Sequence, residues 1–264
     1  MIDLAVLRST DQLAKAIGVA TTDVEAFLAA PSTMLRSVKI PRRDRARPPR
    51  QAWDITSFLV KGALKHLSWI LTDFVCSTQP ARFPHPSVHG FVSFFALYTS
   101  AQKLNTPTPD RRSALTNATV HAGAPRLLNA DIQDFFGSIK KDVVEQSLLT
   151  LGIRPEGAAL LASLTTLDGA VPLGYPTSPL ISNLIMLDID EQFSALAAHY
   201  KATYSRYADD LAFSGHDRLP SKGELQEMLS VKGRTIHRSK CRATKRGQAQ
   251  YVTGFSVSES TPRA

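Results

Sequence analysis

Two adjacent acids stand between apolar, β-prone segments in the stretch Ser205-Arg206-Tyr207-Ala208-Asp209-Asp210-Leu211-Ala212-Phe213-Ser214. This pattern predicts two antiparallel strands within residues 203–215, joined by a tight turn that carries Asp209 and Asp210 at its tip. A second strand-like segment, residues 126–131, also ends in an acid, Asp131. Helical patterns surround these strands, so the expected fold class is α+β.

Apolar residues recur at helical spacing in four segments, residues 56–76, 143–151, 158–167 and 180–197. Residues 10–30 predict two shorter helices with a turn between them. This pair resembles a DNA-reading helix-turn-helix, although packing within a subdomain explains the same pattern. Residues 39–50 are basic and contain prolines, which disfavour a helix and favour an extended hairpin or loop.

The composition is that of a globular protein with a basic surplus. Lys and Arg number 31 against 23 acids, which gives a formal charge of +8. Such a surplus predicts a polyanionic partner, most often nucleic acid, although some soluble proteins are merely basic. The two cysteines favour a reducing compartment. No signal peptide is evident, and prolines interrupt the uncharged run 169–187, so we expect a cytoplasmic protein without a membrane partner.

The acids at the ends of the predicted strands allow two interpretations. Asp131, Asp209 and Asp210 could be turn residues with solvated side chains. Alternatively, they meet across a sheet and hold divalent cations, since Mg²⁺ prefers carboxylate oxygens together with water and substrate phosphates. Two such ions can activate an attacking hydroxyl and stabilise the leaving oxygen of a phosphoryl transfer. The basic surplus favours the second interpretation.

Three motifs, in this order along the chain, resemble those of reverse transcriptases. Residues 127–139 resemble the first catalytic strand of that family, and residues 174–183 resemble the loop and helix start that support template and nucleotide. The segment Tyr207-Ala208-Asp209-Asp210 resembles the catalytic hairpin. The resemblance implies an RNA-directed DNA polymerase, a nucleotidyltransferase that uses two Mg²⁺ ions.

Shorter motifs resemble the bacterial retron reverse transcriptases. They are Asn117-Ala118-Thr119-Val120-His121, Val252-Thr253-Gly254, His89-Gly90-Phe91-Val92 and Arg112-Ser113. The resemblance covers about residues 40–254 and implies a right-hand polymerase fold with an antiparallel palm sheet packed on helices. The expected division is N-terminal helices and fingers in 1–126, palm with interleaved fingers helices in 127–254, and the start of a thumb or a truncated tail in 255–264.

The sequence departs from the family pattern at three places. Residues 93–111 form a longer segment that the resemblance does not explain. Leu173 stands where related polymerases often carry glutamine, so a template contact by that side chain is lost. The family continues into a helical thumb, whereas ten residues follow Gly254 here, so we expect most of the thumb to lie outside this sequence, either in a longer chain or supplied otherwise.

The resemblance also implies roles for individual residues at the active site. Asp131, Asp209 and Asp210 would be the catalytic metal ligands, and Ile132 would offer a metal its backbone carbonyl. Phe136 would pack under the nucleotide sugar and exclude a ribose 2′-hydroxyl; alternatively, it is a core residue.

Further residues are expected to bind the nucleotide and the RNA. The expected nucleotide-binding residues are Arg43, Arg47, Arg50, Gly174 and Pro176, where the planar arginine fork suits phosphate. The expected RNA-binding residues are Asn117, His121, Arg238, Lys240 and Arg242. Alternatively, His121 caps local backbone. Arg43, Arg47 and Arg50 could instead belong to a solvated charged hairpin. Lys240 could also protonate departing pyrophosphate.

The implied reaction copies a structured noncoding RNA, which serves as template and primer, into a multicopy single-stranded DNA–RNA hybrid. The implied partners are this RNA, the RNA–DNA hybrid product, dNTPs and an effector protein, and the implied role is antiphage defence. One alternative is another bacterial reverse transcriptase, from a different defence system or an intron. Others are a nonenzymatic RNA–DNA-binding scaffold of a defence complex and a helix-turn-helix regulator.

Overall fold

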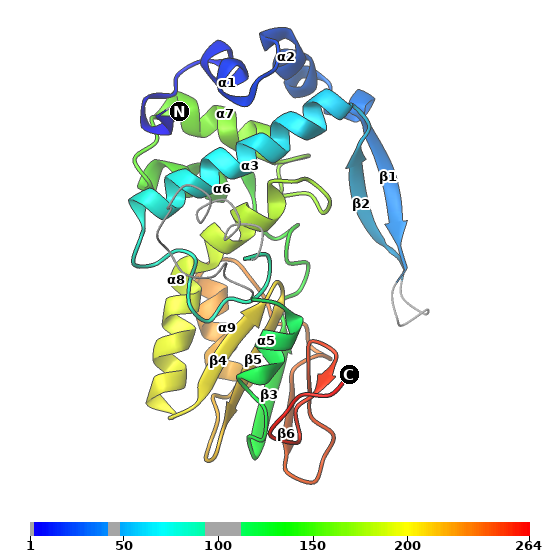
Figure 1. Ribbon diagram of the computed structural model, residues 1–264, viewed down its shortest axis with the longest axis vertical. Helices are drawn as coiled ribbons and strands as arrows, with labels where there is room; N and C mark the ends of the chain where they lie inside the picture. Colours follow the sequence, from blue (N-terminus) through cyan, green and yellow to red (C-terminus); the bar gives the residue numbers. More distant parts are fainter. Residues whose placement is uncertain (1–2, 42–47, 93–111) are drawn as a thin grey trace. The chain divides into compact units, whose positions relative to one another are not determined.

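The computed structural model describes residues 3–41, 48–92 and 112–264 (Figure 1). The chain divides into two compact units, each built from two separate chain segments. The first, called the helical unit, comprises Met1–Thr78 and Phe136–Ile185; the second, called the sheet unit, comprises Gln79–Phe135 and Met186–Ala264. These compact units do not coincide with the expected functional division at residues 126 and 254, which stays a prediction.

The helical unit is mainly α-helical. Its elements are η1 (Leu4–Val6), α1 (Thr10–Ile17), α2 (Thr21–Ala29), η2 (Pro31–Met34), β1 (Leu35–Ile40), β2 (Arg50–Ile55), α3 (Phe58–Thr78), α6 (Lys141–Thr150) and α7 (Pro155–Thr165). Apolar side chains from one face of α3, Leu64, Leu67 and Leu71, are buried, as the helical spacing predicts. The hydroxyl of Ser9 caps α1 by accepting the Gln12 amide, and Gly18 ends this helix with a φ of 77°.

The two described ends of the basic segment 39–50 reach into strands β1 and β2, which pair antiparallel as expected for a hairpin. In this hairpin Ile40 lies opposite Arg50. Farther along β2, the Trp53 amide donates to the Leu173 carbonyl at 2.8 Å, which ties the hairpin to the loop before α8 (Ser178–His199). Residues 42–47 lie outside the described part of the chain.

The sheet unit is built around four antiparallel strands in the order β4-β5-β3-β6 (Figure 1). Its elements are α5 (Ala114–Thr119), β3 (Arg126–Asp131), β4 (Thr203–Tyr207), β5 (Asp210–Gly215), α9 (Lys222–Val231), β6 (Arg242–Lys245), β7 (Tyr251–Val252) and β8 (Phe255–Ser256), and α8 contributes residues to both units. The mixture of helices with an antiparallel sheet confirms the expected α+β class.

Both faces of the sheet carry apolar residues that anchor it. On one face Phe193 of α8 lies 5.5 Å from the Tyr204 ring and 5.8 Å from the Phe213 ring, in edge-to-face geometry. On the other face Leu127 and Ala212 form a buried cluster with residues from α5 and the C-terminal segment. Because side chains alternate between faces along a strand, these two cores fix the register in which β3 meets β5.

The two long helices, α3 and α8, carry polar residues within their apolar sequences. Examples are Lys61 and Lys65 in α3, and Asp188 and Asp190 in α8. In the part of the chain that the structure describes, no helix combines the length and apolar character needed to cross a membrane.

Candidate active site

The structure brings the three predicted acids to one end of the sheet. Strands β3 and β5 pair antiparallel, with Asp131 directly opposite Asp210. The amide of Ile132 donates to the Asp209 carbonyl at 2.9 Å, so the pairing continues one step beyond the two strands. Since directly opposed residues have Cβ atoms about 5 Å apart, this register holds the Asp131 and Asp210 carboxylates as neighbours.

A lysine from a later segment reaches the first of these acids. The Lys240 ammonium forms an ion pair with Oδ2 of Asp131, whose side chain is only 7% exposed. The backbone of the same segment is also fixed here, because the His237 amide donates to the Asp131 carbonyl at 2.7 Å. This segment therefore contacts both the carboxylate and the backbone carbonyl of Asp131, and the carboxylate already stabilises one cation, the Lys240 ammonium.

The donor set at this end of the sheet fits a hard divalent cation. Two opposed carboxylates supply oxygen ligands, and the Lys240 ammonium shows that the site already attracts positive charge. Among the described residues, no three acidic, histidine or cysteine side chains form a complete metal cluster. Magnesium commonly completes its shell with water and substrate phosphates, so an incomplete protein shell suits a site that binds metal together with nucleotide.

The turn that joins β4 to β5 has a strained backbone and a close neighbour. Ala208 adopts a φ of 55°, a conformation that non-glycine residues rarely take. A Cβ atom added to Gly90 would lie 2.5 Å from the Ala208 amide nitrogen, so only glycine permits this approach. The neighbouring segment also pairs with β4, because the Arg206 amide donates to the Ser87 carbonyl and the His89 amide donates to the Arg206 carbonyl.

A buried ion pair also supports the turn between β4 and β5. The Arg206 guanidinium donates to both carboxylate oxygens of Asp190, at 2.8 and 2.7 Å, and both side chains are fully buried. A further donor of Arg206 reaches the Ala208 carbonyl at 3.0 Å. Burial alone would lower the pKa of Arg206, but the adjacent Asp190 carboxylate more than offsets this and keeps the pKa above its ordinary value. The pair thus links α8 directly to the peptide that precedes Asp209.

No sequence motif had indicated a role for either member of this pair. Asp190 could have been noticed, because it is an acid among apolar residues of α8, and Asp188 lies two positions before it. Asp188 instead lies at the surface, where it pairs with Arg82 and Lys232. Its exposure shows why spacing alone did not distinguish the structural acid from the surface acid.

The two adjacent phenylalanines after Asp131 have different environments. Phe135 is 4% exposed, and the Arg206 guanidinium lies 6.0 Å from its ring centroid, so it is a core residue of the sheet unit. Phe136 is only half-buried. The prediction that Phe136 packs against the nucleotide sugar therefore concerns the more accessible ring of the two.

The structure places Asn117 and His121 inside the protein, which argues against the predicted RNA contact. Both residues are 1% exposed. The His121 ring nitrogens lie 2.7 Å from the hydroxyls of Ser214 in β5 and Ser205 in β4. Both nitrogens are thus engaged within the sheet unit by side chains far along the chain rather than by local backbone, so His121 links the segment that follows α5 to strands β4 and β5. Asn117 lies on α5 beside this site, with its Oδ1 buried and without a hydrogen-bond partner in the described structure.

The buried histidine makes the stability of the protein sensitive to acid. Burial, with a smaller contribution from His89, lowers the pKa of His121 from 6.5 to about 3. A histidine whose pKa falls on folding stabilises the fold fully above its unfolded pKa and loses this contribution as the pH falls. We therefore expect the free energy of unfolding to decrease below about pH 6.5, with His121 contributing up to about 1.4 kcal/mol per pH unit.

Urea unfolding at a series of pH values measures this effect. His121→Gln retains a donor and an acceptor but cannot titrate, so its stability should fall less steeply between pH 6.5 and about 3. The matched control His216→Gln replaces an exposed histidine of the same unit and should keep the slope of the unmodified protein. Identical slopes for the unmodified protein and His121→Gln would contradict the assignment.

The Val252-Thr253-Gly254 motif forms a tight turn beside α5. Thr253 and Gly254 have φ values of 48° and 91°, as a two-residue hairpin of type I′ requires, and they join β7 to β8. The Thr253 hydroxyl donates to the Ala114 carbonyl at 2.7 Å. Val252 and Ala118 share the buried cluster described above. The motifs at residues 117–121 and 252–254, which are far apart in sequence, therefore pack together within the sheet unit.

The expected nucleotide-binding residues are only partly described. Arg43 and Arg47 lie outside the described residues, whereas Arg50 is exposed at the start of β2. Gly174 has a φ of 111°, and an added Cβ would lie 2.3 Å from the Trp53 carbonyl oxygen, so this position requires glycine for packing. Pro176 is half-buried in the following turn. Nucleotide binding by these residues stays a prediction.

A second basic run, residues 232–246, divides between the two ends of the sheet. Lys240 lies at the end that carries the three acids, where it pairs with Asp131, while Arg238 is exposed nearby in sequence. Strand β6 then runs antiparallel to β3, from Arg242 opposite Asn129 to Lys245 opposite Arg126. The run is therefore not one continuous track, and RNA binding by Arg238, Lys240 and Arg242 stays a prediction.

Comparison with known proteins supports the interpretation of the motifs. Residues 60–256 match the family model described as reverse transcriptase (RNA-dependent DNA polymerase). The chain is 32% identical to the retron Mx162 reverse transcriptase of Myxococcus xanthus, across 96% of this chain and 54% of that protein. It is 33% identical to the retron Mx65 reverse transcriptase of the same organism, across 89% of this chain and 57% of that protein.

The fold also resembles that of a solved polymerase structure. A telomerase from Candida tropicalis, solved in complex with a fragment of telomeric RNA, aligns with 91% of this chain and 48% of its own. The TM-score is 0.51 at 8% sequence identity, so the likeness concerns the fold alone. The chain spans about half the length of the two curated Myxococcus xanthus relatives. The chain belongs to the reverse transcriptase (RNA-dependent DNA polymerase) family.

Proposed function

We propose that this chain supplies the fingers and palm of a retron-type RNA-directed DNA polymerase. The enzyme copies a structured noncoding RNA, starting from a 2′-hydroxyl of that RNA, into a multicopy single-stranded DNA–RNA hybrid. It uses dNTPs, releases pyrophosphate, and acts in the cytoplasm with an effector protein in antiphage defence. The observation that carries the proposal is the register of β3 and β5, which sets Asp131 opposite Asp210 with Asp209 tied to Ile132.

The residues at this end of the sheet support a phosphoryl transfer that depends on metal. Asp131, Asp209 and Asp210 would hold Mg²⁺, with Ile132 offering its carbonyl. When bound, two such ions activate the attacking hydroxyl and stabilise the leaving oxygen. The protein holds its carboxylates in place through the backbone bonds of Asp131 and Asp209 and through the Arg206–Asp190 pair beneath the turn. Positioning of this kind reduces the entropic cost of reaching the transition state.

The nucleic acid that copurifies with the full protein tests the product and the priming chemistry. We expect one structured RNA joined to single-stranded DNA complementary to part of it. The DNA should be released by an enzyme that cleaves 2′–5′ branches, and it should be absent when the protein carries Asp210→Asn. RNA without attached DNA from the unmodified protein would favour the scaffold alternative. DNA with an ordinary 3′–5′ junction would favour another class of reverse transcriptase.

Replacement of Phe136 by alanine tests how the site selects its sugar. If the half-buried ring excludes the 2′-hydroxyl, the smaller side chain should raise ribonucleotide incorporation relative to deoxyribonucleotide incorporation by about 10-fold or more. Incorporation of single matched nucleotides measures the ratio. The matched control is Phe135→Leu, which alters the neighbouring core ring and should leave the ratio unchanged. An unchanged ratio in Phe136→Ala would show that Phe136 is only a packing residue.

A further inference from the structure

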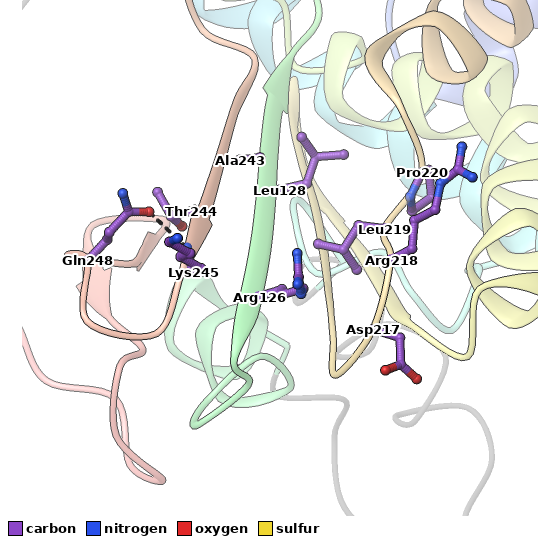
Figure 2. Close-up of a pocket in the computed structure, with 10 residues that line it drawn as sticks. All are labelled: Arg126, Leu128, Asp217, Arg218, Leu219, Pro220, Ala243, Thr244, Lys245 and Gln248. Carbon is purple, nitrogen blue, oxygen red and sulfur yellow. Dashed lines mark hydrogen bonds between the residues drawn. The ribbon is translucent and has the colours of Figure 1, made fainter.

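A groove of about 610 Å³ lies on the sheet unit (Figure 2). Its floor includes Leu128 of β3 and Ala243 of β6, and one wall is the loop that follows β5. Three cationic side chains line it: Arg126, Arg218 and Lys245. One acid, Asp217, also lines the groove, so the lining is cationic by a margin of two charges, three minus one.

Two of the cations face each other across paired strands. Arg126 lies directly opposite Lys245 in the register of β3 and β6, and both residues are exposed. Directly opposed residues project from the same face of a sheet, and like charges in such a pair repel one another. Neither side chain forms an ion pair with another described residue. An anion between them would relieve this repulsion.

The other charged residues of the groove are arranged differently. The Arg218 guanidinium lies 5.8 Å from the ring centroid of Tyr200, which holds it on the wall formed by the loop. Asp217 is exposed on the same loop, and its carboxylate points away from Arg126 in Figure 2. The opposed pair on the strands is therefore the part of the groove that suits an anionic ligand.

The groove is separate from the candidate active site. Arg126 begins β3 and Asp131 ends it. A strand rises about 3.3 Å per residue, so the five steps between these residues span about 17 Å. A ligand at Arg126 and Lys245 is thus too far away to be the nucleotide at Asp131, but a long polyanion could reach both places.

We propose that this groove binds the phosphate backbone of a paired segment of the template RNA, outside the segment that is being copied. The inference rests on the proposed function, because it takes the ligand to be the RNA on which the enzyme acts. Paired RNA presents two rows of phosphates but a major groove too narrow for side chains, so proteins recognise it mainly through backbone and shape. Opposed cations on a rigid sheet suit contact with the phosphates of such a backbone. The formal charge of +8 favours a polyanionic partner such as RNA over a basic partner.

Binding of a fully paired RNA hairpin, as a function of salt concentration, tests the proposal. The double variant Arg126→Gln with Lys245→Gln should bind about 10-fold more weakly near 0.1 M salt, and its log–log salt slope should be smaller by about 2. The charge-conserving variant Arg126→Lys with Lys245→Arg should bind nearly as well as the unmodified protein. The matched control Arg8→Gln with Lys15→Gln removes two exposed cations of the helical unit and should change the slope less.

A melting measurement and a second ligand make the result decisive. Removing the opposed charges relieves repulsion, so the melting temperature of the double variant should not fall. Equal slopes for the groove variant and the unmodified protein, or equal losses in the groove and control variants, would overturn the proposal. If the groove variant lost binding to polyglutamate but kept the binding of paired RNA, the groove would be a surface for an acidic protein instead.

Extension of a short primed RNA template separates this proposal from the proposed function. The groove variant should extend this template at the rate of the unmodified protein, because the template has no paired segment beyond the site of synthesis. A protein that binds the hairpin through the groove but extends no template would disprove the polymerase assignment while leaving the groove intact. Normal extension together with unchanged hairpin binding in the variant would disprove the groove alone.

Discussion

Replacing Asp210 by asparagine is expected to abolish DNA synthesis while leaving RNA affinity close to that of the unmodified protein. Asp210 faces Asp131 in the register of β5 and β3, so its charge contributes directly to any cation held between them. A metal supplies several kcal/mol of transition-state stabilisation, and its loss should reduce the rate by about 1,000-fold or more. RNA affinity comes mainly from phosphate contacts of cations elsewhere, so it should change little.

Primer extension and RNA binding, measured on the same preparation, check this expectation. Glu227→Gln is the matched control, because it removes an exposed acid from α9 of the same unit and should leave synthesis unchanged. Synthesis near the normal rate in Asp210→Asn would exclude a catalytic role for this carboxylate. An equal loss of RNA binding and synthesis would show that the substitution damages the fold rather than the chemistry.

Replacing Asp190 by asparagine should destabilise the protein by about 3–5 kcal/mol, because it leaves the buried Arg206 guanidinium without its counter-charge. A second buried arginine, Arg234, makes this loss more severe. Burial, together with the nearby charge of Arg206, lowers the pKa of Arg234 to about 10. Without Asp190, two buried cations would therefore repel each other near the turn that joins β4 to β5.

The control for Asp190 lies on the same helix. Asp188→Asn breaks only surface ion pairs, with Arg82 and Lys232, and should cost less than about 1 kcal/mol in urea unfolding. A cost below about 1 kcal/mol for Asp190→Asn as well would contradict the importance of the buried pair.

A double variant separates the stabilising role of the pair from its positioning role. Asp190→Leu with Arg206→Met replaces the pair by apolar side chains of similar size, which often restores stability. It also removes the hydrogen bond from Arg206 to the Ala208 carbonyl. The kcat of this double variant should therefore be lower than that of the unmodified protein, while its KM for dNTPs should change less. Recovery of kcat together with stability would show that Arg206 has no positioning role.

The main features of the fold and the meeting of the three acids at one end of the sheet could be predicted because they depend on local patterns. An apolar segment that ends in Asp131, and apolar segments that flank Asp209 and Asp210, favour strands and a turn from local sequence alone. The long helices followed equally from their apolar spacing, with ends shifted by a few residues.

What could not be predicted depends on contacts between residues far apart in sequence. His121 belongs to a motif that suggested RNA recognition, yet its partners are serines 84 and 93 positions later, and only the folded sheet brings them together. The Lys240–Asp131 pair spans 109 positions, so the charge of the basic run alone could not show which cation reaches the acid. The division of the same run between two ends of the sheet likewise depends on the register of β6 against β3.

RNA-templated primer extension by the full protein tests the central claim most directly. With a primed RNA template, the four dNTPs and Mg²⁺, the unmodified protein should make DNA complementary to the template. Synthesis should cease when Mg²⁺ is chelated or when Asp131 is replaced by asparagine. A protein that binds the primed RNA yet incorporates no nucleotide, or whose synthesis is unaffected by Asp131→Asn, would contradict the claim that the acids of β3 and β5 form a polymerase active site.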